Sequence, residues 1–131
     1  MAGTLALVGS GEYLDAMRPL EQRLLSGRPP RYVQIATAAV PDGDDRLAYW
    51  HELGKSQATA LDVECVIATA RTHDEANRPE VADKVRGAGL IYLSGGHPGF
   101  LADVLRGSLL WRTIVDEWQQ GASLAGCSAG A

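Results

Sequence analysis

The sequence has 131 residues, of which 46% are hydrophobic and 21% charged, as in a globular protein of one domain. The net charge of −4 excludes a nucleic-acid-binding protein held by a basic face, and no apolar run is long enough for a membrane helix. The two cysteines form no metal-ligand spacing and no disulfide framework, and no signal peptide is visible. We therefore expect a cytoplasmic protein with no nucleic-acid or membrane partner.

Five short runs rich in Val, Ile and Leu predict five β-strands. They are residues 4–8, 32–36, 63–68, 90–93 and 123–125. Continuous apolar runs are typical of strands buried on both faces, as in a parallel sheet. We expect the last run to lie at an edge of this sheet, where one side of the strand has no partner.

Segments with apolar residues at helical spacing separate these runs. Their apolar positions are Met17, Leu20 and Leu24, then Leu47, Trp50, Ala58 and Leu61, then Val81, Ala82 and Val85 after Pro79, and finally Leu110, Ile114 and Trp118; a further helix starts near Phe100. The alternation of strand and helix predicts an α/β fold with an open, mainly parallel sheet and helices on both faces.

Three glycine-rich turns follow predicted strands, at residues 9–11, 95–96 and 126–130. Ligands bind at the carboxyl ends of the strands in open parallel sheets, and glycine lets the backbone approach a ligand closely. We therefore expect a ligand site where these turns meet.

The third turn, residues 126–130, contains the pattern G-x-S-x-G centred on Ser128. This pattern is typical of a nucleophile elbow, a strained turn between strand and helix that exposes the serine hydroxyl. Small neighbours are needed because the turn brings backbone segments almost into contact. In an elbow the N–H of Ala129 faces the site of a forming oxyanion. The alternative is a glycine-rich turn in which the serine only caps a helix.

A second oxyanion donor is expected from the loop at residues 93–99, which has two glycines after a strand and a helix start behind them. The N–H of Gly96 is the candidate donor, and a purely structural turn is the alternative.

These two segments together resemble the cyanophycinase and aspartyl dipeptidase (peptidase E) family of serine peptidases. The opening residues 7–12 and the run at 33–38 are similar to the first two strands of that family. The resemblance implies a fold like class I glutamine amidotransferase domains, a flavodoxin-like three-layer sandwich. It also implies that Ser128 is the nucleophile and that the Gly96 and Ala129 amides form the oxyanion hole. His97 departs from the Asn or Asp often found at its position in the family.

In this family the general-base histidine and its acid follow the nucleophile, whereas the sequence stops three residues after Ser128. We therefore interpret residues 1–131 as the N-terminal part of one amidotransferase-like peptidase domain, cut just after the elbow. The predicted function is a serine hydrolase that cleaves a small peptide or isopeptide-like amide through an acyl-enzyme on Ser128, with no cofactor and no metal. The alternative is a non-catalytic protein that binds a small molecule or a partner. The sequence leaves open whether the protein forms a homodimer.

Other polar residues near these turns have alternative roles. His97 is a candidate substrate contact or base and Gly11 a candidate substrate contact, while surface or capping roles are favoured for His51 and His73. Glu12 is expected to cap a helix or hold a loop rather than contact substrate. We expect Cys127 to be a small buried filler that points away from the site.

Overall fold

The computed structural model describes residues 2–131 and contains one sheet of five parallel strands. The strands are β1 (Leu5–Val8), β2 (Arg31–Ile35), β3 (Glu64–Ile67), β4 (Leu90–Leu93) and β5 (Ser123–Cys127). All five lie within one or two residues of the predicted runs. The Val, Ile and Leu runs and the parallel sheet that they predict are confirmed.

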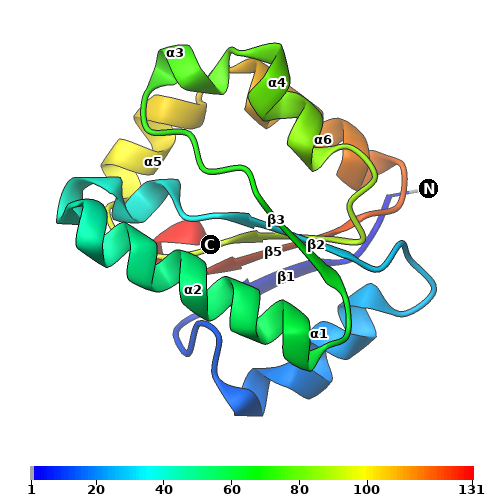
Figure 1. Ribbon diagram of the computed structural model, residues 1–131. Helices are drawn as coiled ribbons and strands as arrows, with labels where there is room; N and C mark the ends of the chain where they lie inside the picture. Colours follow the sequence, from blue (N-terminus) through cyan, green and yellow to red (C-terminus); the bar gives the residue numbers. More distant parts are fainter. Residues whose placement is uncertain (1) are drawn as a thin grey trace.

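The strand order is β1-β5-β4-β2-β3 (Figure 1). Strand β5 lies between two partners, since Leu124 is in register with Leu5 on one side and with Ile91 on the other. The expectation that this strand forms an edge is therefore wrong, and the edges are β1 and β3. Every residue of β5 is buried, as an interior strand of a parallel sheet requires.

Helices separate the strands along the chain. They are α1 (Arg18–Leu25), α2 (Asp44–Ala60), α3 (His73–Ala76), α4 (Pro79–Ala82), α5 (Pro98–Leu105) and α6 (Leu109–Gln119), with 3₁₀ turns η1 (Asp15–Met17), η2 (Thr37–Asp42), η3 (Asp83–Val85) and η4 (Ser128–Gly130). Helices α1, α5 and α6 each end two residues before a glycine. The predicted helix after Pro79 is divided into α4 and η3. The single turn α3 was not predicted because it buries only Ala76 and has no apolar period.

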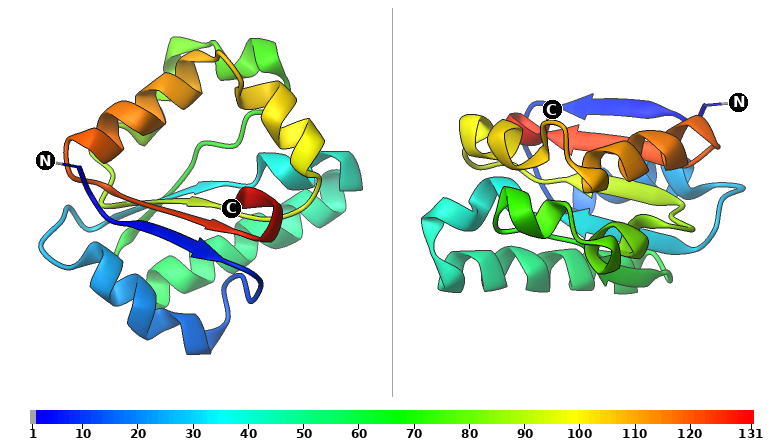
Figure 2. Two further views of the ribbon diagram at one scale, coloured as in Figure 1. Left: turned by 180° about the vertical axis from the view of Figure 1, so that it is seen from behind. Right: turned by 90° about the horizontal axis from the view of Figure 1, so that it is seen from above.

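The helices form two layers, one on each face of the sheet (Figure 2). Helices α1 and α2 cover one face, on which Tyr32, Leu90 and Tyr92 are part of a cluster of buried side chains. Helices α3 to α6 cover the other face, where Val33 and Ile91 lie in a larger apolar cluster. The three-layer α/β arrangement is the one predicted. Because the strands are parallel, the carboxyl ends of all five, and the loops that follow them, lie at the same edge of the sheet.

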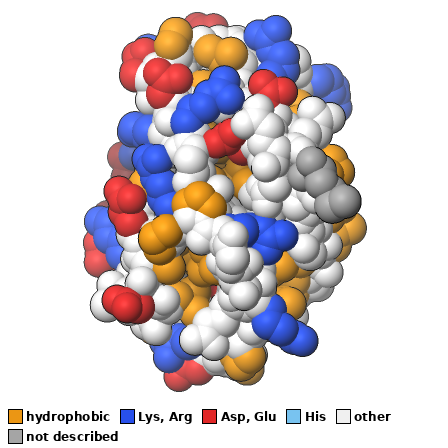
Figure 3. Space-filling model, turned by 90° about the vertical axis from the view of Figure 1, so that its right-hand side faces the viewer, with side chains coloured by type: hydrophobic (Ala, Val, Ile, Leu, Met, Phe, Trp, Pro, Cys, Tyr) orange, Lys and Arg blue, Asp and Glu red, His pale blue; other side chains and the backbone are white. Residues whose placement is uncertain are grey.

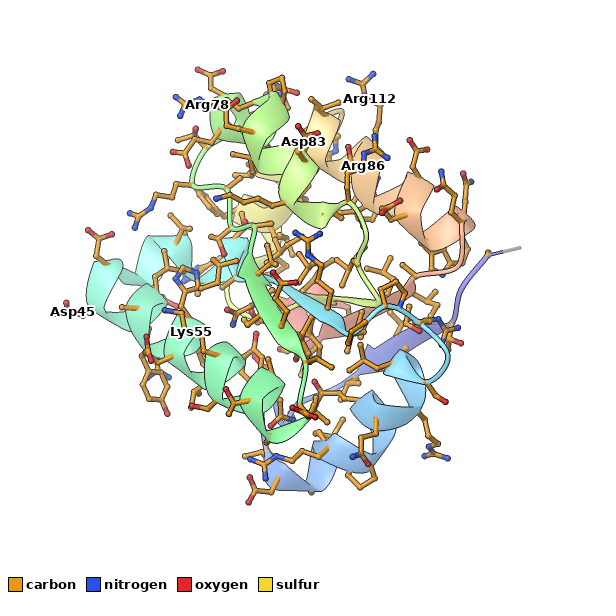
Figure 4. All side chains as sticks on the ribbon, turned by 45° about the vertical axis from the view of Figure 1, so that its right-hand side comes forward. Asp45, Lys55, Arg78, Asp83, Arg86 and Arg112 are labelled. Atoms are coloured by element: carbon orange, nitrogen blue, oxygen red, sulfur yellow. The ribbon has the colours of Figure 1, made fainter. Side chains whose placement is uncertain are left out.

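The charged side chains lie mainly on the outer surfaces of the helices. On the face seen in Figure 3, basic and acidic side chains are interspersed rather than gathered by sign. The side chains labelled in Figure 4 all point outward and are exposed; they are Asp45, Lys55, Arg78, Asp83, Arg86 and Arg112. Within residues 2–131, no helix has both the length and the apolar character needed to cross a membrane.

Candidate active site

Three loops meet at the edge of the sheet where the strands end. The Glu12 carboxylate, just after β1, accepts hydrogen bonds from the Gly95 N–H and from the Cys127 thiol, each over 3.1 Å. A Cβ atom placed on Gly95 would lie 3.1 Å from the Cβ of Ser128. The glycine-rich turns after β1, β4 and β5 are thus brought together, as the sequence predicts.

Ser128 is the first residue after β5 and begins η4. Its φ angle of 53° lies in the left-handed region, which is uncommon for a residue with a side chain. Ser128 is exposed, whereas the preceding Cys127 is completely buried. The backbone therefore turns sharply at this point and presents the serine side chain at the surface.

The two glycines of the G-x-S-x-G pattern allow this turn to close on itself. A Cβ atom on Gly126 would collide with the carbonyl oxygen of Gly130. A Cβ atom on Gly130 would collide in the same way with the carbonyl oxygen of Leu93, at the end of β4. The predicted reason for small residues beside Ser128, a close approach of backbone segments, is confirmed.

The loop after β4 directs its two glycine amides differently. The Gly95 N–H is bonded to Glu12, and the His97 N–H donates to the Ala38 carbonyl over 2.7 Å. Between them, the Gly96 N–H has no protein acceptor among residues 2–131. Gly96 has a φ of 148°, and a Cβ atom there would collide with the backbone of Ala38. Gly96 directly follows Gly95, which approaches Ser128, so its N–H without an acceptor is a candidate for the donor that an oxyanion hole requires.

The second candidate donor, the Ala129 N–H, lies in the first turn of η4. The N–H groups of a first helical turn have no partner within the helix, so this group is available to a ligand.

Cys127 is held as a neutral thiol. Burial is the largest cause that raises its pKa to about 12, and the hydrogen bond to the Glu12 carboxylate adds to the effect. Because the thiolate is the nucleophilic form, a thiol of this kind is inert at neutral pH. The expectation that Cys127 is a buried filler understated its role, because its thiol also donates to Glu12.

The three histidines are each bonded elsewhere. His97 Nε2 lies 2.7 Å from Asp42 Oδ1, His51 Nε2 lies 3.0 Å from Thr69 Oγ1, and His73 Nδ1 lies 2.9 Å from the Val104 carbonyl. Within residues 2–131, the structure contains no hydrogen bond between a histidine and Ser128. Burial lowers the pKa of His51. The roles of His97 and Gly11 toward a substrate stay predictions.

An apolar groove of about 340 Å³ lies beside the Ser128 turn. It is lined by Leu5 and Leu7 of β1, by Trp111, Val115 and Trp118 of α6, and by residues of β4, β5 and the 126–131 turn. Leu5 and Leu7 are 52% and 65% exposed, unlike the other apolar strand residues that face this layer, which are buried or half-buried. Among residues 2–131, no group of three or more His, Cys, Asp or Glu side chains is placed to hold a metal ion.

Sequence reasoning missed the contacts of Glu12 and Tyr13 with the β4 loop. Tyr13 is buried, and its hydroxyl donates to Ser94 Oγ over 3.1 Å. The one sequence feature that could have indicated these contacts is the polar pair Glu12 and Tyr13, directly after a glycine-rich turn at the expected ligand site. Its partners lie 81 to 115 residues away, so no local pattern could identify them.

Comparisons with known proteins agree with this architecture. The model of peptidase family S51 matches residues 5–131. A crystal structure of a peptidase from an acI-B1 Actinobacterium superimposes with a TM-score of 0.96 at 44% identity, over 100% of this chain and 56% of that one.

A second structure, a putative peptidase E protein from Listeria monocytogenes EGD-e, shares the fold with a TM-score of 0.70 at 24% identity. That match covers 100% of this chain and 61% of the other, so the chain spans less than two thirds of either structure. No curated protein sequence matches the chain. The family match extends over nearly every residue, and the chain therefore belongs to peptidase family S51.

Proposed function

We propose that the protein is a serine-type peptidase that cleaves a small peptide or isopeptide-like amide through an acyl-enzyme on Ser128. The observation that carries the proposal is an exposed serine with a φ of 53°, in a chain of a peptidase family; the loop that approaches it contains the Gly96 N–H, which has no acceptor among residues 2–131. A left-handed backbone at a serine between strand and helix is the geometry of a nucleophile elbow. The alternative role, a serine that only caps a helix, requires no such strain.

The reaction proceeds in two steps. In the first, the Ser128 oxygen attacks the amide carbon, its proton passes to a general base, and the carbonyl oxygen becomes an oxyanion that accepts hydrogen bonds from the Gly96 and Ala129 amides. The carbon–nitrogen bond then breaks, and the base returns the proton to the leaving amine. In the second step, water attacks the ester, its proton passes to the same base, and Ser128 recovers its proton as the acid product leaves.

The general-base histidine and its acid are proposed to come from sequence that follows Ala131. Two observations support this: the histidines within residues 2–131 have other partners, and the matched structures are much longer than this chain. The apolar groove beside β1 would be covered by part of that sequence. We refer to residues 1–131 together with this further sequence as the complete enzyme, and we propose that it acts in the cytoplasm without a cofactor.

The test is covalent labelling of the complete enzyme with a fluorophosphonate, read by intact mass. We expect one adduct on the wild-type protein and none on Ser128→Ala, because the substitution removes only the attacking oxygen. Ser56→Ala, at an exposed serine of α2, is the matched control and should label normally. Hydrolysis of aspartyl and β-aspartyl dipeptides by Ser128→Ala should fall by about 10⁴-fold or more.

Two outcomes would contradict the proposal. Loss of the adduct in Cys127→Ala together with its retention in Ser128→Ala would identify a cysteine nucleophile. Absence of any adduct on the wild-type complete enzyme would favour the non-catalytic alternative, a protein that binds a small molecule or a partner in the same site.

A further inference from the structure

Glu12 holds together the two segments that flank the candidate site. Its Oε1 atom accepts from the thiol of Cys127, the residue before Ser128. Its Oε2 atom accepts from the N–H of Gly95, the residue before Gly96. One carboxylate therefore links the carboxyl end of β5 to the loop after β4. Its two partners, Gly95 and Cys127, are 83 and 115 residues from Glu12 in the sequence.

The carboxylate and the candidate nucleophile both lie against Gly95. A Cβ atom on Gly95 would lie 2.9 Å from Glu12 Oε2 and 3.1 Å from Ser128 Cβ, so the carboxylate and the serine side chain contact the same small region. Because there is no side chain at Gly95, these groups approach each other closely. A shift of the Glu12 side chain would therefore be transmitted to both neighbours.

The local backbone brings this carboxylate inward under strain. Gly11 and Tyr13, on either side of Glu12, both have positive φ angles, of 96° and 62°. A positive φ at a bulky tyrosine persists only where the surrounding contacts fix it. Those contacts are present: Tyr13 donates to Ser94, and Glu12 accepts from Gly95. Two neighbouring residues are thus hydrogen-bonded to two neighbouring residues at the end of β4.

The chemistry of the two partners requires an acceptor at each Glu12 oxygen. Both partners are donors: the Gly95 amide has an N–H, and the Cys127 thiol keeps its proton because burial raises its pKa to about 12. An ionised carboxylate offers only acceptors, whereas a glutamine amide would present an NH₂ group to one of the two donors. Glutamine therefore matches the shape of Glu12 but not its hydrogen bonds.

We propose that Glu12 is a positioning residue, which fixes the Gly95 peptide so that the following N–H, on Gly96, stays free and aligned with Ser128. This rests on the proposed hydrolysis at Ser128. The hydrogen bonds that Glu12 accepts within residues 2–131 come from Gly95 and Cys127, and none comes from Ser128. A carboxylate provides no donor to an oxyanion, so we propose that Glu12 contributes through alignment alone.

The experiment compares Glu12→Gln with wild type in the complete enzyme, using dipeptide hydrolysis and amide hydrogen exchange at Gly95. We expect kcat to fall by up to about 100-fold with KM changed less than about threefold, since misaligned donors act in the transition state. Exchange at the Gly95 amide should accelerate. Glu80→Gln, at an exposed glutamate of α4, is the control that leaves both readouts unchanged.

A double variant separates alignment from mere packing. In Glu12→Gln with Cys127→Ala, the glutamine NH₂ no longer faces the thiol, and its oxygen can accept from Gly95. We expect this double variant to recover part of kcat relative to Glu12→Gln alone. A purely structural role predicts the opposite, because the second change adds a cavity.

The outcomes distinguish the two proposals. If wild type hydrolyses dipeptides and Glu12→Gln retains or gains kcat, the positioning role is overturned and the nucleophile stands. If the double variant is slower than Glu12→Gln, the positioning role is likewise overturned. If wild type neither hydrolyses nor labels, the proposed function fails and the positioning proposal falls with it, whatever exchange at Gly95 reports about the contact.

Discussion

The two faces of the sheet are stabilised by different chemistry. The face covered by α3 to α6 is packed by apolar side chains, among them Ile91 and Leu110. The face covered by α1 and α2 buries Tyr13, Tyr32 and Tyr92 together with several polar side chains. Apolar packing has no direction and tolerates substitution by similar volumes, whereas hydrogen bonds fix orientation. The face stabilised by hydrogen bonds is the one connected to the candidate site, through Tyr13 and Ser94.

The polar face contains two hydrogen-bond chains. In the first, Tyr32 and Gln57 donate to the two oxygens of Glu21 over 2.6 and 2.7 Å, and Glu21 is completely buried. In the second, Gln34 donates to the Tyr13 hydroxyl over 2.6 Å, and Tyr13 donates to Ser94. The second chain ends one residue before Gly95. These hydrogen bonds therefore connect the buried side chains of this layer to the loop that contains Gly96.

The largest effect on stability is expected on the apolar face. Ile91 is completely buried in the interior strand β4, so Ile91→Ala should lower the free energy of unfolding of the complete enzyme by about 2–5 kcal/mol. Urea denaturation measures the change. Because nothing polar is disturbed, kcat of the folded fraction should stay at the wild-type value, and a large fall in kcat would contradict the division between the two faces.

A smaller effect is expected for Tyr32→Phe, which removes one donor from buried Glu21. Hydrogen bonds to charged groups contribute about 1.5–3 kcal/mol, and we expect a loss in that range at neutral pH. Burial raises the pKa of Glu21, while the bonds from Tyr32 and Gln57 partly oppose the rise. Loss of the Tyr32 bond should therefore raise this pKa further.

The sign of the pH dependence follows from that shift. Below the ordinary pKa of a glutamate, about 4.3, both the folded and the unfolded chain hold the proton. As the pH rises from there through the folded pKa, the unfolded chain loses its proton first, so the free energy of unfolding falls. Tyr32→Phe should steepen this fall and act least at acid pH. Glu21→Gln should flatten it, and an unchanged slope in Glu21→Gln would contradict the assignment.

The smallest effect is expected for Tyr92→Phe, on the same face. The Tyr92 hydroxyl is buried beside the Cys127 thiol and has no oxygen or nitrogen partner among residues 2–131. Its removal should leave the free energy of unfolding unchanged or raise it by up to about 1 kcal/mol, because an unsatisfied polar group is lost. Tyr32→Phe deletes the same atom from the neighbouring strand, where the rings stack at 6.0 Å, and is the matched comparison. Equal losses in the two variants would show that hydrogen bonding does not distinguish these positions.

Much of the fold could be predicted because the strands carry local signals. A run such as residues 90–93 consists of apolar and aromatic residues and lies between Gly89 and Ser94-Gly95, which indicates a buried strand without any knowledge of its neighbours. The order of the strands has no such signal, and β5 was misplaced at an edge because pairing depends on packing across the whole chain. The left-handed turn at Ser128 was predictable because G-x-S-x-G encodes it over five residues.

The supporting contacts of the candidate site were not predictable in the same way. Glu12 has partners in two distant loops, and its neighbouring residues favour a helix cap equally well. The engagement of His97 by Asp42 also depends on the path of η2, which contains a proline and has no helical period. Roles that arise from tertiary contacts appear only once the loops are assembled.

The strand order also determines when each strand can pair as the chain leaves the ribosome. Strands β2, β3 and β4 are neighbours of one another and can associate once residue 93 has emerged. Strand β1 is made before them, yet its only partner among the described strands is β5, with Leu5 in register with Leu124. At about 5–20 residues per second, β1 waits unpaired for roughly 6–25 seconds. The earliest strand is thus the last to join, and during synthesis its leucines are a natural target for chaperones that bind exposed apolar segments.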